Sequence, residues 1–594
     1  MLGVWRWPGG SLAAGVNMCA LAATMMAQYP EVHSAAKKSS RPATYCNPVD
    51  LDYRFALDEP SRREAADPTM VVYHGEYWLF ASKSGGYWHS TDLRSWKLIE
   101  GRGYPVEVYA PTVVEIGGKL YLSAFDDPWI YSSSDPASGH WEKAAALPPN
   151  ADPDLFLDDD RRLYMYGGCS DKEPLRVTEL AARHDFRVLA GPKPTVMTDP
   201  ANHGWQVRGD ANENFGERPW LEGSWMTKHD GKYYLQFSVP ATQDKTYCDG
   251  VAVADSPMGP FLEAAYNPVS FKPTGFITGA GHSSTFLDHT GAYWHISTMT
   301  ISVRDMYERR LGLFPAGFTA DGQMTVDTYL GDYPHVFSRT AKTTLAGWML
   351  LDYDKLVTAS SSLPGHQPER AVHEDVRNWW SAATGNPGEW LQVDMGGPRR
   401  IEAVQINFAD EGSNTLGPSN DAYRYVIERS SDGTHWETLV DRRSNQRDAP
   451  HEYMQLDSSV VARYVRITNL HTPGNAKFSI SGFRLFGNGL HQAPGKVVSL
   501  RANRDAEDPR KAAISWQPVQ GADFYIVRFG VKPDRLFENY QVYHATHLDL
   551  ASLNVGVEYS VTVDAVNDSG IARGKTVVSM PLPTRAAKPP HVEP

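Results

Sequence analysis

The 594-residue sequence has few cysteines, no excess of basic residues and no long run of apolar residues. Its four cysteines follow no metal-ligand spacing, and the three that lie beyond the N-terminal region can form at most one disulfide. The formal net charge of -13 excludes the basic surface that a nucleic-acid partner requires. The apolar stretch at residues 12–27 is too short and too rich in alanine and glycine to be a stable membrane span.

The N-terminal region has the pattern of a secretory signal. Arg6 precedes the apolar stretch, and a polar segment with Lys37, Lys38 and Arg41 follows it. We therefore predict a signal peptide at residues 1–36, with a cleavage point between residues 27 and 36. The mature protein is expected to be secreted, either periplasmic or extracellular.

Aromatic residues are abundant, with 17 Trp and 29 Tyr. Both residue types stack on sugar rings, although β-rich cores use them as well. The chain is also too long for one hydrophobic core, so several domains are expected. These two observations indicate several domains and leave open whether the aromatic residues stack on sugars or pack in β-rich cores.

Five segments between residues 67 and 337 share one pattern, a turn followed by an alternating aromatic strand. They are HGEYWLF (74–80), GGKLYLS (117–123), DRRLYMY (160–166), DGKYYLQ (230–236) and TGAYWHI (290–296). An apolar strand precedes each turn, and a polar turn with a further strand follows several of them. This order is typical of four-stranded antiparallel blades, so the sequence predicts an all-β, five-bladed β-propeller.

The innermost strand of each predicted blade starts near a shared axis, so the residues at these starts should converge. They are Asp67, Ala110, Asp152, Glu222 and His282. Bringing three like charges together costs stability. The constellation therefore indicates a catalytic function rather than a role in folding.

Five motifs carry a resemblance to a known family: AADP (65–68), YAPT (109–112), ADPDLFLDDD (151–160), LEGSWMTK (221–228) and GHSSTF (281–286). With them, residues 44–340 resemble glycoside hydrolase family 43, whose members are five-bladed propellers that invert the anomeric centre with three carboxyl groups. The resemblance implies that Asp67 is the general base and Glu222 the general acid. It also implies that Asp152 modulates the acid's pKa, and that His282 lies in the axial channel, where the family holds water or calcium.

The expected chemistry agrees with this assignment. Inverting hydrolysis requires a carboxylic acid and a carboxylate base about 6.5–9.5 Å apart, and a neighbouring carboxylate favours the protonated acid because it disfavours a second negative charge. Each role has a rival in the sequence: Asp154 beside Asp152, and Glu213 or Glu217 upstream of Glu222.

Candidate substrate contacts are Trp88, His282, Arg309 and Arg310. The resemblance implies that an arginine near residues 307–318 contacts sugar hydroxyls, and both arginines remain candidates. Trp205 and Trp225 are further stacking candidates, and residues 202–218 are expected to form a loop over the pocket.

The resemblance implies an exo-acting enzyme that removes terminal arabinofuranose- or xylose-type sugars from plant cell-wall polysaccharides. A β-galactofuranosidase or exo-galactanase of the same family is the alternative. A non-catalytic carbohydrate-binding propeller is the alternative from another class, but the chain has both Asp67 and Glu222. Retaining enzymes of similar architecture need Asn-Asp-Pro, whereas Ala66 precedes Asp67 here. No cofactor is required for hydrolysis, and a monomer is expected.

Two further domains follow. The motifs GEWLQVDMG (388–396), ARYVRITNL (462–470) and FSISGFRLFG (478–487) resemble the discoidin-like domain of coagulation factors V and VIII, also used as family 32 carbohydrate-binding modules. This resemblance implies a β-sandwich of the galactose-binding jelly-roll type at residues 348–490. A structural calcium ion is expected either in the propeller channel or in this domain, near residues 374–377.

The last part of the chain resembles a fibronectin type III domain. The motifs AISWQPV (513–519), FYIVRFG (524–530) and VEYSVTVDAVN (557–567), with Tyr559 in the tyrosine-corner place, imply an immunoglobulin-like sandwich at residues 494–584. Residues 585–594 are rich in proline and charge and are predicted to be a disordered tail.

Overall fold

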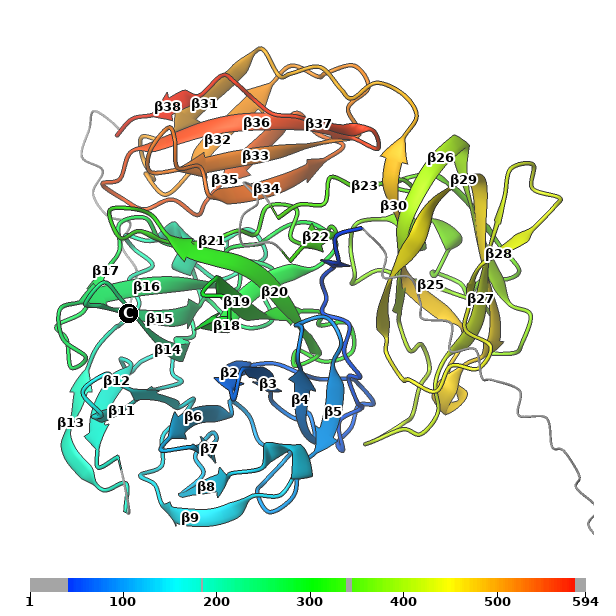
Figure 1. The fold of residues 1–594 in the computed structure, drawn as a ribbon. Helices are drawn as coiled ribbons and strands as arrows, with labels where there is room; N and C mark the ends of the chain where they lie inside the picture. Colours follow the sequence, from blue (N-terminus) through cyan, green and yellow to red (C-terminus); the bar gives the residue numbers. More distant parts are fainter. Residues whose placement is uncertain (1–40, 183–184, 338–343, 583–594) are drawn as a thin grey trace, which may run out of the picture. The chain divides into compact units, whose positions relative to one another are not determined.

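The computed structural model describes residues 41–182, 185–337 and 344–582 (Figure 1). The predicted signal peptide and the predicted C-terminal tail lie outside the described residues. The expected all-β fold class is confirmed, because the helices in the described part of the chain are four short 3-10 turns: η1 (Pro136–Ser138), η2 (Gly204–Gln206), η3 (Pro368–Val372) and η4 (Pro473–Asn475). Among these residues no helix is long and apolar enough to cross a membrane.

Five four-stranded antiparallel sheets follow one another along the described residues between 69 and 326. The first consists of β2 (Thr69–Tyr73), β3 (Glu76–Phe80), β4 (Gly86–Ser90) and β5 (Lys97–Glu100). The second consists of β6 (Thr112–Ile116), β7 (Lys119–Ser123), β8 (Trp129–Ser133) and β9 (Glu142–Ala146). The third consists of β10 (Asp154–Leu157), β11 (Leu163–Gly167), β12 (Arg176–Leu180) and β13 (Val188–Pro194).

The last two of these sheets carry the longest strands of the set. The fourth consists of β14 (Glu222–His229), β15 (Lys232–Val239), β16 (Cys248–Ala254) and β17 (Leu262–Glu263). The fifth consists of β18 (Thr278–Leu287), β19 (Tyr293–Thr300), β20 (Arg309–Phe318) and β21 (Met324–Val326). A short pair, β1 (Thr44–Tyr45) with β22 (His335–Val336), joins the two ends of this region.

The first strands of the five sheets contact one another in sequence order, and β18 returns to contact β2. The five aligned aromatic residues all lie in the second strands, β3, β7, β11, β15 and β19. In the first three sheets, this residue pairs with the third residue of the first strand. In the last two sheets, Tyr234 pairs with Thr227 and Trp294 pairs with Phe286. Trp78, Tyr164, Tyr234 and Trp294 are buried between neighbouring sheets. Burial of a large apolar side chain stabilises the fold by about 1.5–3 kcal/mol, so these positions hold the sheets together.

The starts of the first strands share an unusual backbone conformation. Asp67, Ala110, Asp152 and His282 all have φ between 43 and 52 degrees, in the left-handed region that residues other than glycine rarely adopt. Asp67, Ala110 and Asp152 lie two residues before the first paired residue of their sheets, and His282 lies two residues before Ser284, where the pairing of β18 with β19 resumes after a register shift. The equivalent position in the fourth sheet is Gly223, with φ of 66 degrees.

The predicted alignment of Glu222 with Asp67 and Asp152 is therefore off by one residue. The pairing of β14 with β15 shifts between Glu222 and Trp225, and this irregularity is not visible in the sequence. A Cβ atom at Gly223 would lie 2.3 Å from Ser238 Oγ and 3.1 Å from His282 Cα. An acidic side chain does not fit there, so the fourth sheet presents its acid one residue earlier.

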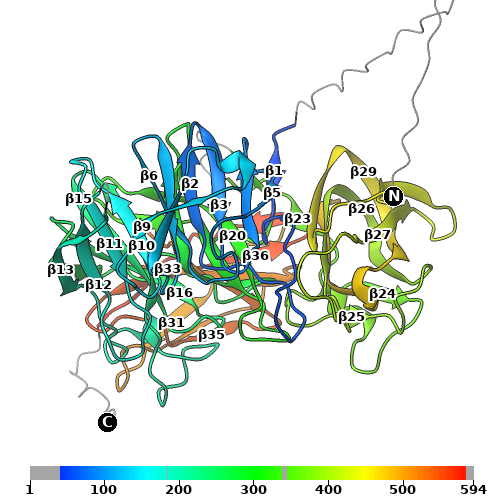
Figure 2. The ribbon, with the colours of Figure 1, turned by 90° about the horizontal axis from the view of Figure 1, so that it is seen from below.

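Residues 349–489 form an eight-stranded β-structure, drawn in light green to yellow-orange in Figures 1 and 2. Its strands in the described chain are β23 (Met349–Leu350), β24 (Leu356–Ala359), β25 (Trp380–Ser381), β26 (Trp390–Phe408), β27 (Arg424–Ser430), β28 (Glu437–Asp441), β29 (His451–His471) and β30 (Ser479–Gly489). Trp380, Leu391 and Phe483 lie in its core. The buried position of Trp380 shows that this residue packs and does not face a ligand.

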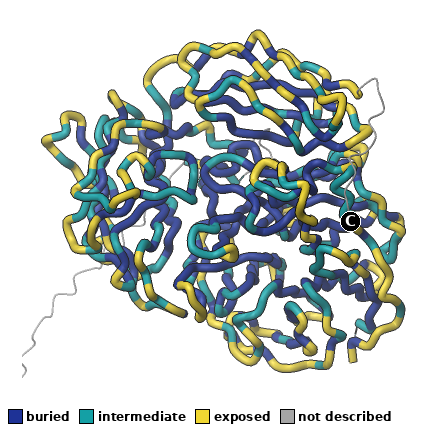
Figure 3. Tube along the Cα trace, turned by 180° about the vertical axis from the view of Figure 1, so that it is seen from behind, coloured by how far each residue is buried: buried dark blue, intermediate teal, exposed yellow. Residues whose placement is uncertain are grey.

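Residues 500–580 form two further sheets. One has the order β31 (Leu500–Arg504), β32 (Ala512–Trp516), β35 (His547–Leu550). The other contains β33 (Phe524–Gly530), β34 (Glu538–Tyr543), β36 (Tyr559–Asn567), β37 (Gly570–Ala572) and β38 (Val578–Met580). Trp516 and Tyr525 pack together between them, with ring centroids 5.2 Å apart. Buried positions follow the strands of the described chain, whereas exposed ones gather at the turns (Figure 3).

Candidate active site

One cavity of about 470 Å³ lies among the starts of the inner strands. It brings together five of the seven site residues that the sequence predicts. These are Asp67, Asp152, Glu222, His282 and Arg309. The remaining lining residues are Tyr109, Phe125, Cys169, Arg208, Trp220, Ala241, Thr242, Gln243, Met306 and Tyr307.

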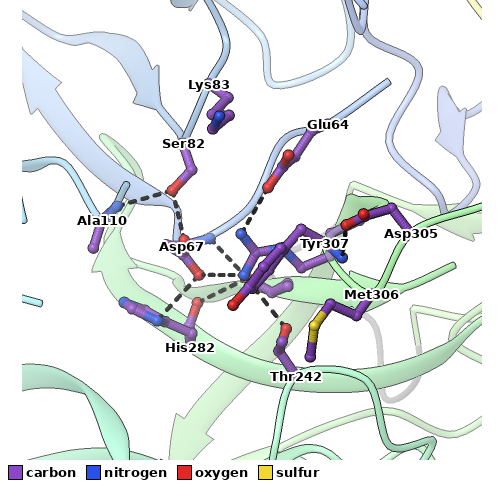
Figure 4. Close-up of polar contacts among 12 residues, drawn as sticks. Glu64, Asp67, Ser82, Lys83, Ala110, Thr242, His282, Asp305, Met306 and Tyr307 are labelled. Atoms are coloured by element: carbon purple, nitrogen blue, oxygen red, sulfur yellow. Dashed lines mark hydrogen bonds and ion pairs between the residues drawn. The ribbon is translucent and has the colours of Figure 1, made fainter. Parts of the chain in front are cut away.

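Asp67 is almost fully buried and is held by two cationic side chains (Figure 4). Its Oδ1 lies 3.2 Å from Arg309 Nη1 and 3.1 Å from His282 Nδ1. Its Oδ2 accepts a hydrogen bond of 2.5 Å from Ser82 Oγ. Burial alone would raise the pKa of Asp67, but Arg309, His282 and Ser82 outweigh it and hold this pKa below the ordinary value. Asp67 is therefore a carboxylate at neutral pH.

Arg309 is the first residue of β20 and links Asp67 to a second buried carboxylate. Its Nη2 donates to Glu64 Oε1 at 2.9 Å. Its guanidinium also lies 5.3 Å from the ring centre of Tyr307 and 5.6 Å from that of Tyr109. The two carboxylates outweigh the burial penalty and raise the pKa of Arg309. The side chain is thus a fixed cation at the base of the cavity.

The surroundings of Asp152 shift its pKa in the opposite direction from that of Asp67. Burial raises its pKa to about 7, and the nearby carboxylates of Glu222 and Asp67 add to this against the lowering effect of His282. His282 Nδ1 lies 3.9 Å from Asp152 Oδ2. Near neutral pH the buried Asp152 therefore binds and releases a proton.

Glu222 accepts hydrogen bonds from two uncharged groups. Tyr247 Oη donates to Oε1 at 2.6 Å, and Cys169 Sγ donates to Oε2 at 3.4 Å. One ligand atom each of Asp152, Cys169 and Glu222 lies within 4.8 Å of the others. Glu222, Asp152 and Cys169 thus form one cluster, and His282 lies between it and Asp67.

His282 lies between the carboxylates. Its backbone N–H donates to Ser238 Oγ at 2.7 Å, which anchors the middle of β18 to β15. Burial would lower the pKa of His282, but Asp67, Asp152 and Glu222 outweigh it and raise this pKa. The imidazole is therefore favoured as a cation, and it offsets part of the charge of the three acids.

Two predicted substrate contacts do not reach the cavity. Trp88 is fully buried and packs near Tyr53, with ring centroids 6.1 Å apart. Arg310 points away from the cavity, because its Nε donates to His451 Nε2 at 2.8 Å and its Nη1 to the carbonyl oxygen of Arg63 at 2.6 Å. Alternation along β20 explains this, since neighbouring residues of a strand face opposite sides. The geometry supports Arg309 as the sugar-contacting arginine and gives Trp88 a packing role.

The rival acids also lie outside the cavity lining. Asp154 is buried and accepts the backbone N–H of Met226 at 2.8 Å, and burial raises its pKa to about 7. Glu213 accepts the backbone N–H of Ala211 at 2.8 Å, and Glu217 pairs with Arg208 at 3.1 Å. These contacts show that all three acids have partners within the fold and do not face the cavity.

The other two tryptophan candidates are held by hydrogen bonds. Trp205 is fully buried and donates to Asn554 Oδ1 at 2.9 Å. Trp225 donates to the carbonyl oxygen of Thr285 at 3.0 Å. The insert at residues 202–218 nevertheless contributes Arg208 to the cavity.

The sequence analysis did not identify Tyr247, which contacts Glu222, as a site residue. It also did not identify six residues that line the cavity: Tyr109, Phe125, Cys169, Trp220, Met306 and Tyr307. Two of them had a signal, because Tyr109 directly precedes Ala110-Pro111 and Trp220 lies two residues before Glu222. The bridge between Ser170 and Leu221 brings Cys169 beside Glu222, and no local pattern encodes it.

Comparisons with known proteins agree with this architecture. Residues 61–324 match the family model Glycosyl hydrolases family 43, and residues 357–482 match the F5/8 type C domain. The chain is similar to "Beta-D-galactofuranosidase xynD" of Aspergillus niger, at 24% identity over 308 residues that cover 43% of this chain and 84% of that protein. It is also similar to a "Beta-xylosidase" of Xylanibacter ruminicola, at 26% identity over 168 residues that cover 24% of this chain and 47% of the relative.

Among solved structures, one titled "Glycoside hydrolase" superposes with a TM-score of 0.43 at 19% identity, covering 73% of this chain and 99% of the other. The matched family models account for the two main regions of the chain described above. The protein therefore contains a glycosyl hydrolases family 43 domain at residues 61–324, joined to an F5/8 type C domain at residues 357–482.

Proposed function

We propose that the protein is an inverting exo-glycoside hydrolase whose catalytic domain is a five-bladed β-propeller. The ring of five inner strands supports the propeller, since each four-stranded sheet then corresponds to one blade. The observation that carries the proposed reaction is the contrast between two buried carboxyl groups in one cavity. The pKa of Asp67 is lowered, whereas the pKa of Asp152, beside Glu222, is raised to about 7.

Asp67 acts as the general base in this proposal. Its carboxylate takes a proton from a water molecule as the water oxygen attacks the anomeric carbon. Arg309 and His282 keep Asp67 ionised before the attack and fix its orientation. Attack from the face opposite the leaving group inverts the configuration.

Glu222 acts as the general acid. Its proton passes to the glycosidic oxygen as the bond from that oxygen to the anomeric carbon breaks, and the electron pair of the bond leaves with the oxygen. Asp152 is the proposed modulator, because its carboxyl group lies beside that of Glu222, and two neighbouring carboxyl groups disfavour a second negative charge. At the end of one turnover Asp67 holds a proton and Glu222 is charged, and exchange with solvent restores both.

The proposed substrate is a terminal arabinofuranose- or xylose-type unit at the end of a plant polysaccharide branch. Phe125, Met306 and Tyr307 offer apolar and aromatic surface for the faces of a sugar ring, and Arg309 offers donors for hydroxyl groups. A terminal xylose unit is the related pyranose substrate. The similarity to a protein named a galactofuranosidase favours galactofuranose as the second candidate, and it shares the five-membered ring.

The accessory domains have proposed roles of their own. Residues 494–584 are proposed as a fibronectin type III spacer, supported by the hydrogen bond of 3.1 Å from the Asn554 backbone N–H to Tyr559 Oη, the arrangement of a tyrosine corner. The F5/8 type C domain at residues 348–490 is proposed to take part in carbohydrate binding. Secretion is proposed on the N-terminal sequence alone.

The proposed calcium ion has no fitting ligand set in either expected place among the described residues. In the propeller, the buried Asp249 Oδ2 lies 3.5 Å from His295 Nε2, and one carboxylate oxygen beside an imidazole does not supply the oxygen ligands that calcium takes. In the F5/8 type C domain, both carboxylate oxygens of Glu374 accept from Arg484, so the residues there do not fit calcium.

The test is hydrolysis of nitrophenyl α-L-arabinofuranoside, β-D-xyloside and β-D-galactofuranoside by wild type, with Asp67→Asn as the background control. We expect cleavage of a furanoside, and NMR should show the inverted anomer as the first product. Absence of cleavage on all three and on plant arabinan and xylan would overturn the proposed function. A first product of retained configuration would overturn the assignment of Asp67 as base.

A further inference from the structure

Cys169 stands between the two carboxyl groups on the acid side of the cavity. The bridge of Ser170 with Leu221 fixes the chain after it, and the Gly168 backbone N–H donates to the Ala151 carbonyl oxygen at 2.7 Å before it. Its position is therefore set by the same segments that carry Asp152 and Glu222. The cysteine lines the cavity and is half-buried.

The thiol takes part in a directional chain of hydrogen bonds. Trp220 Nε1–H donates to Cys169 Sγ at 3.0 Å, and Cys169 Sγ–H donates to Glu222 Oε2 at 3.4 Å. Because the indole can only donate, the sulfur accepts from it, and the thiol hydrogen is free to point at Glu222. Tyr247 holds the other oxygen of Glu222, so both oxygens of the carboxyl group are fixed.

The surroundings keep this thiol uncharged. Burial first, and then the carboxylates of Asp152 and Glu222, raise the pKa of the Cys169 thiol far above its ordinary value. A neutral thiol is a weaker donor than a hydroxyl group. A strong donor at this position would favour the charged carboxylate, which cannot serve as an acid.

We propose that Cys169 is a positioning residue that orients the carboxyl group of Glu222 for proton transfer to the leaving oxygen without stabilising its charged form. The inference deepens the proposed function and rests on it. A hydroxyl group at residue 169 would hold Glu222 in place but deplete the protonated acid near neutral pH. A methyl group would leave the acid protonated but free to rotate about its side-chain bonds.

The experiment measures kcat and KM against pH for wild type, Cys169→Ser and Cys169→Ala on an oligosaccharide that wild type cleaves, because its leaving group must be protonated. Cys169→Ser should move the alkaline limb of the kcat/KM profile to lower pH by roughly 0.5–1 unit, the effect of one stronger hydrogen bond to a carboxylate. Cys169→Ala should move it to higher pH or leave it in place, and should lower kcat roughly tenfold with KM changed by less than about twofold.

Cys46→Ser is the matched control. Cys46 is a buried thiol outside the cavity that donates to the Asp332 carbonyl oxygen, so the same chemical change there should leave the pH profile unmoved. Should Cys169→Ser fail to fold, as judged by its melting curve, Trp220→Phe removes the donor to Sγ while keeping an aromatic ring. That variant should change the alkaline limb in a folded protein.

The outcomes distinguish a failure of the Cys169 inference from a failure of the proposed function. If wild type cleaves none of the three nitrophenyl glycosides and neither arabinan nor xylan, the proposed function fails. If wild type cleaves and both Cys169 variants keep its alkaline limb and its kcat, Cys169 has no positioning role. Equal losses in both variants with no movement of the limb would also overturn the inference, because they would indicate packing alone.

Discussion

Asp67 and Glu222 face the same cavity but have opposite partners. The Asp67 carboxylate contacts Arg309 and His282, which are both favoured as cations, and a serine hydroxyl. The Glu222 carboxyl group accepts hydrogen bonds from a tyrosine and a cysteine, both uncharged, and has the acidic Asp152 nearby. Cations favour a charged carboxylate, whereas a neighbouring acid disfavours a second negative charge. Neighbours from other strands thus distinguish the two carboxyl groups, and the proposed base and acid roles follow that difference.

The largest effect is expected from removing the base. Asp67→Asn keeps the shape of the side chain but cannot take a proton from water, so kcat/KM should fall about 10²–10⁴-fold. Because water activation is needed whatever the leaving group, aryl and natural substrates should lose activity alike. Comparison of kcat/KM on a nitrophenyl furanoside and an oligosaccharide measures this. A loss confined to the oligosaccharide would exchange the proposed roles of Asp67 and Glu222.

Removal of the acid should have a selective effect. Glu222→Gln should lower kcat/KM about 10²–10⁴-fold on an oligosaccharide, whose leaving group must be protonated. On a nitrophenyl substrate, whose leaving group departs as a stable anion, the loss should be much smaller. The readout is the ratio of kcat/KM on the two substrates for wild type and variant. An unchanged ratio would contradict the acid role.

Loss of the Arg309 cation should make the surroundings of Asp67 more like those of Glu222. Arg309→Met removes the largest influence that lowers the pKa of Asp67, so this pKa should rise. Asp67 is then protonated at higher pH, and the acidic limb of the kcat/KM profile should move upward with a loss of roughly tenfold at pH 5. Arg309→Lys keeps the charge and is the matched control, which should retain more of the limb. If neither variant moves it, Arg309 does not set the charge of Asp67.

The smallest effect is expected on stability. The pKa of Asp152 is raised from 3.8 to about 7 by folding, so the folded state binds the proton more tightly than the unfolded state. This contribution stabilises the fold below pH 4 relative to pH 7 and is lost as pH rises through 7. Asp152→Asn should therefore raise the Tm relative to wild type by a few degrees at pH 8 and by less at pH 4, while activity at pH 8 falls.

Thermal melting at the two pH values tests this, with Asp159→Asn as control at an exposed acid in a turn. Equal changes in Tm for Asp152→Asn at pH 4 and pH 8 would mean that Asp152 does not carry the raised pKa. A larger gain at pH 8 would confirm that wild type keeps an ionisable group at residue 152 at a cost in stability.

Local patterns in the sequence were sufficient for much of the framework. A turn followed by an aromatic strand recurs five times, and the aromatic residues of all five lie in the second strands of successive sheets. Hydrophobic alternation and turn residues act within a few positions, so they are readable without a structure. The acids before these strands converge for the same reason, because each sheet repeats the one before it.

Other features depended on contacts between sheets. The one-residue offset of Glu222 follows from the lack of space at Gly223 beside Ser238, and the partners Tyr247 and Cys169 come from neighbouring strands and loops. Trp88 and Arg310 had suitable chemistry but face the core and the F5/8 type C domain side. The sequence by itself determined the repeated strands and the residue types at their starts. Only the tertiary structure decided which carboxyl group meets a cation, because that depends on side chains far apart in the chain.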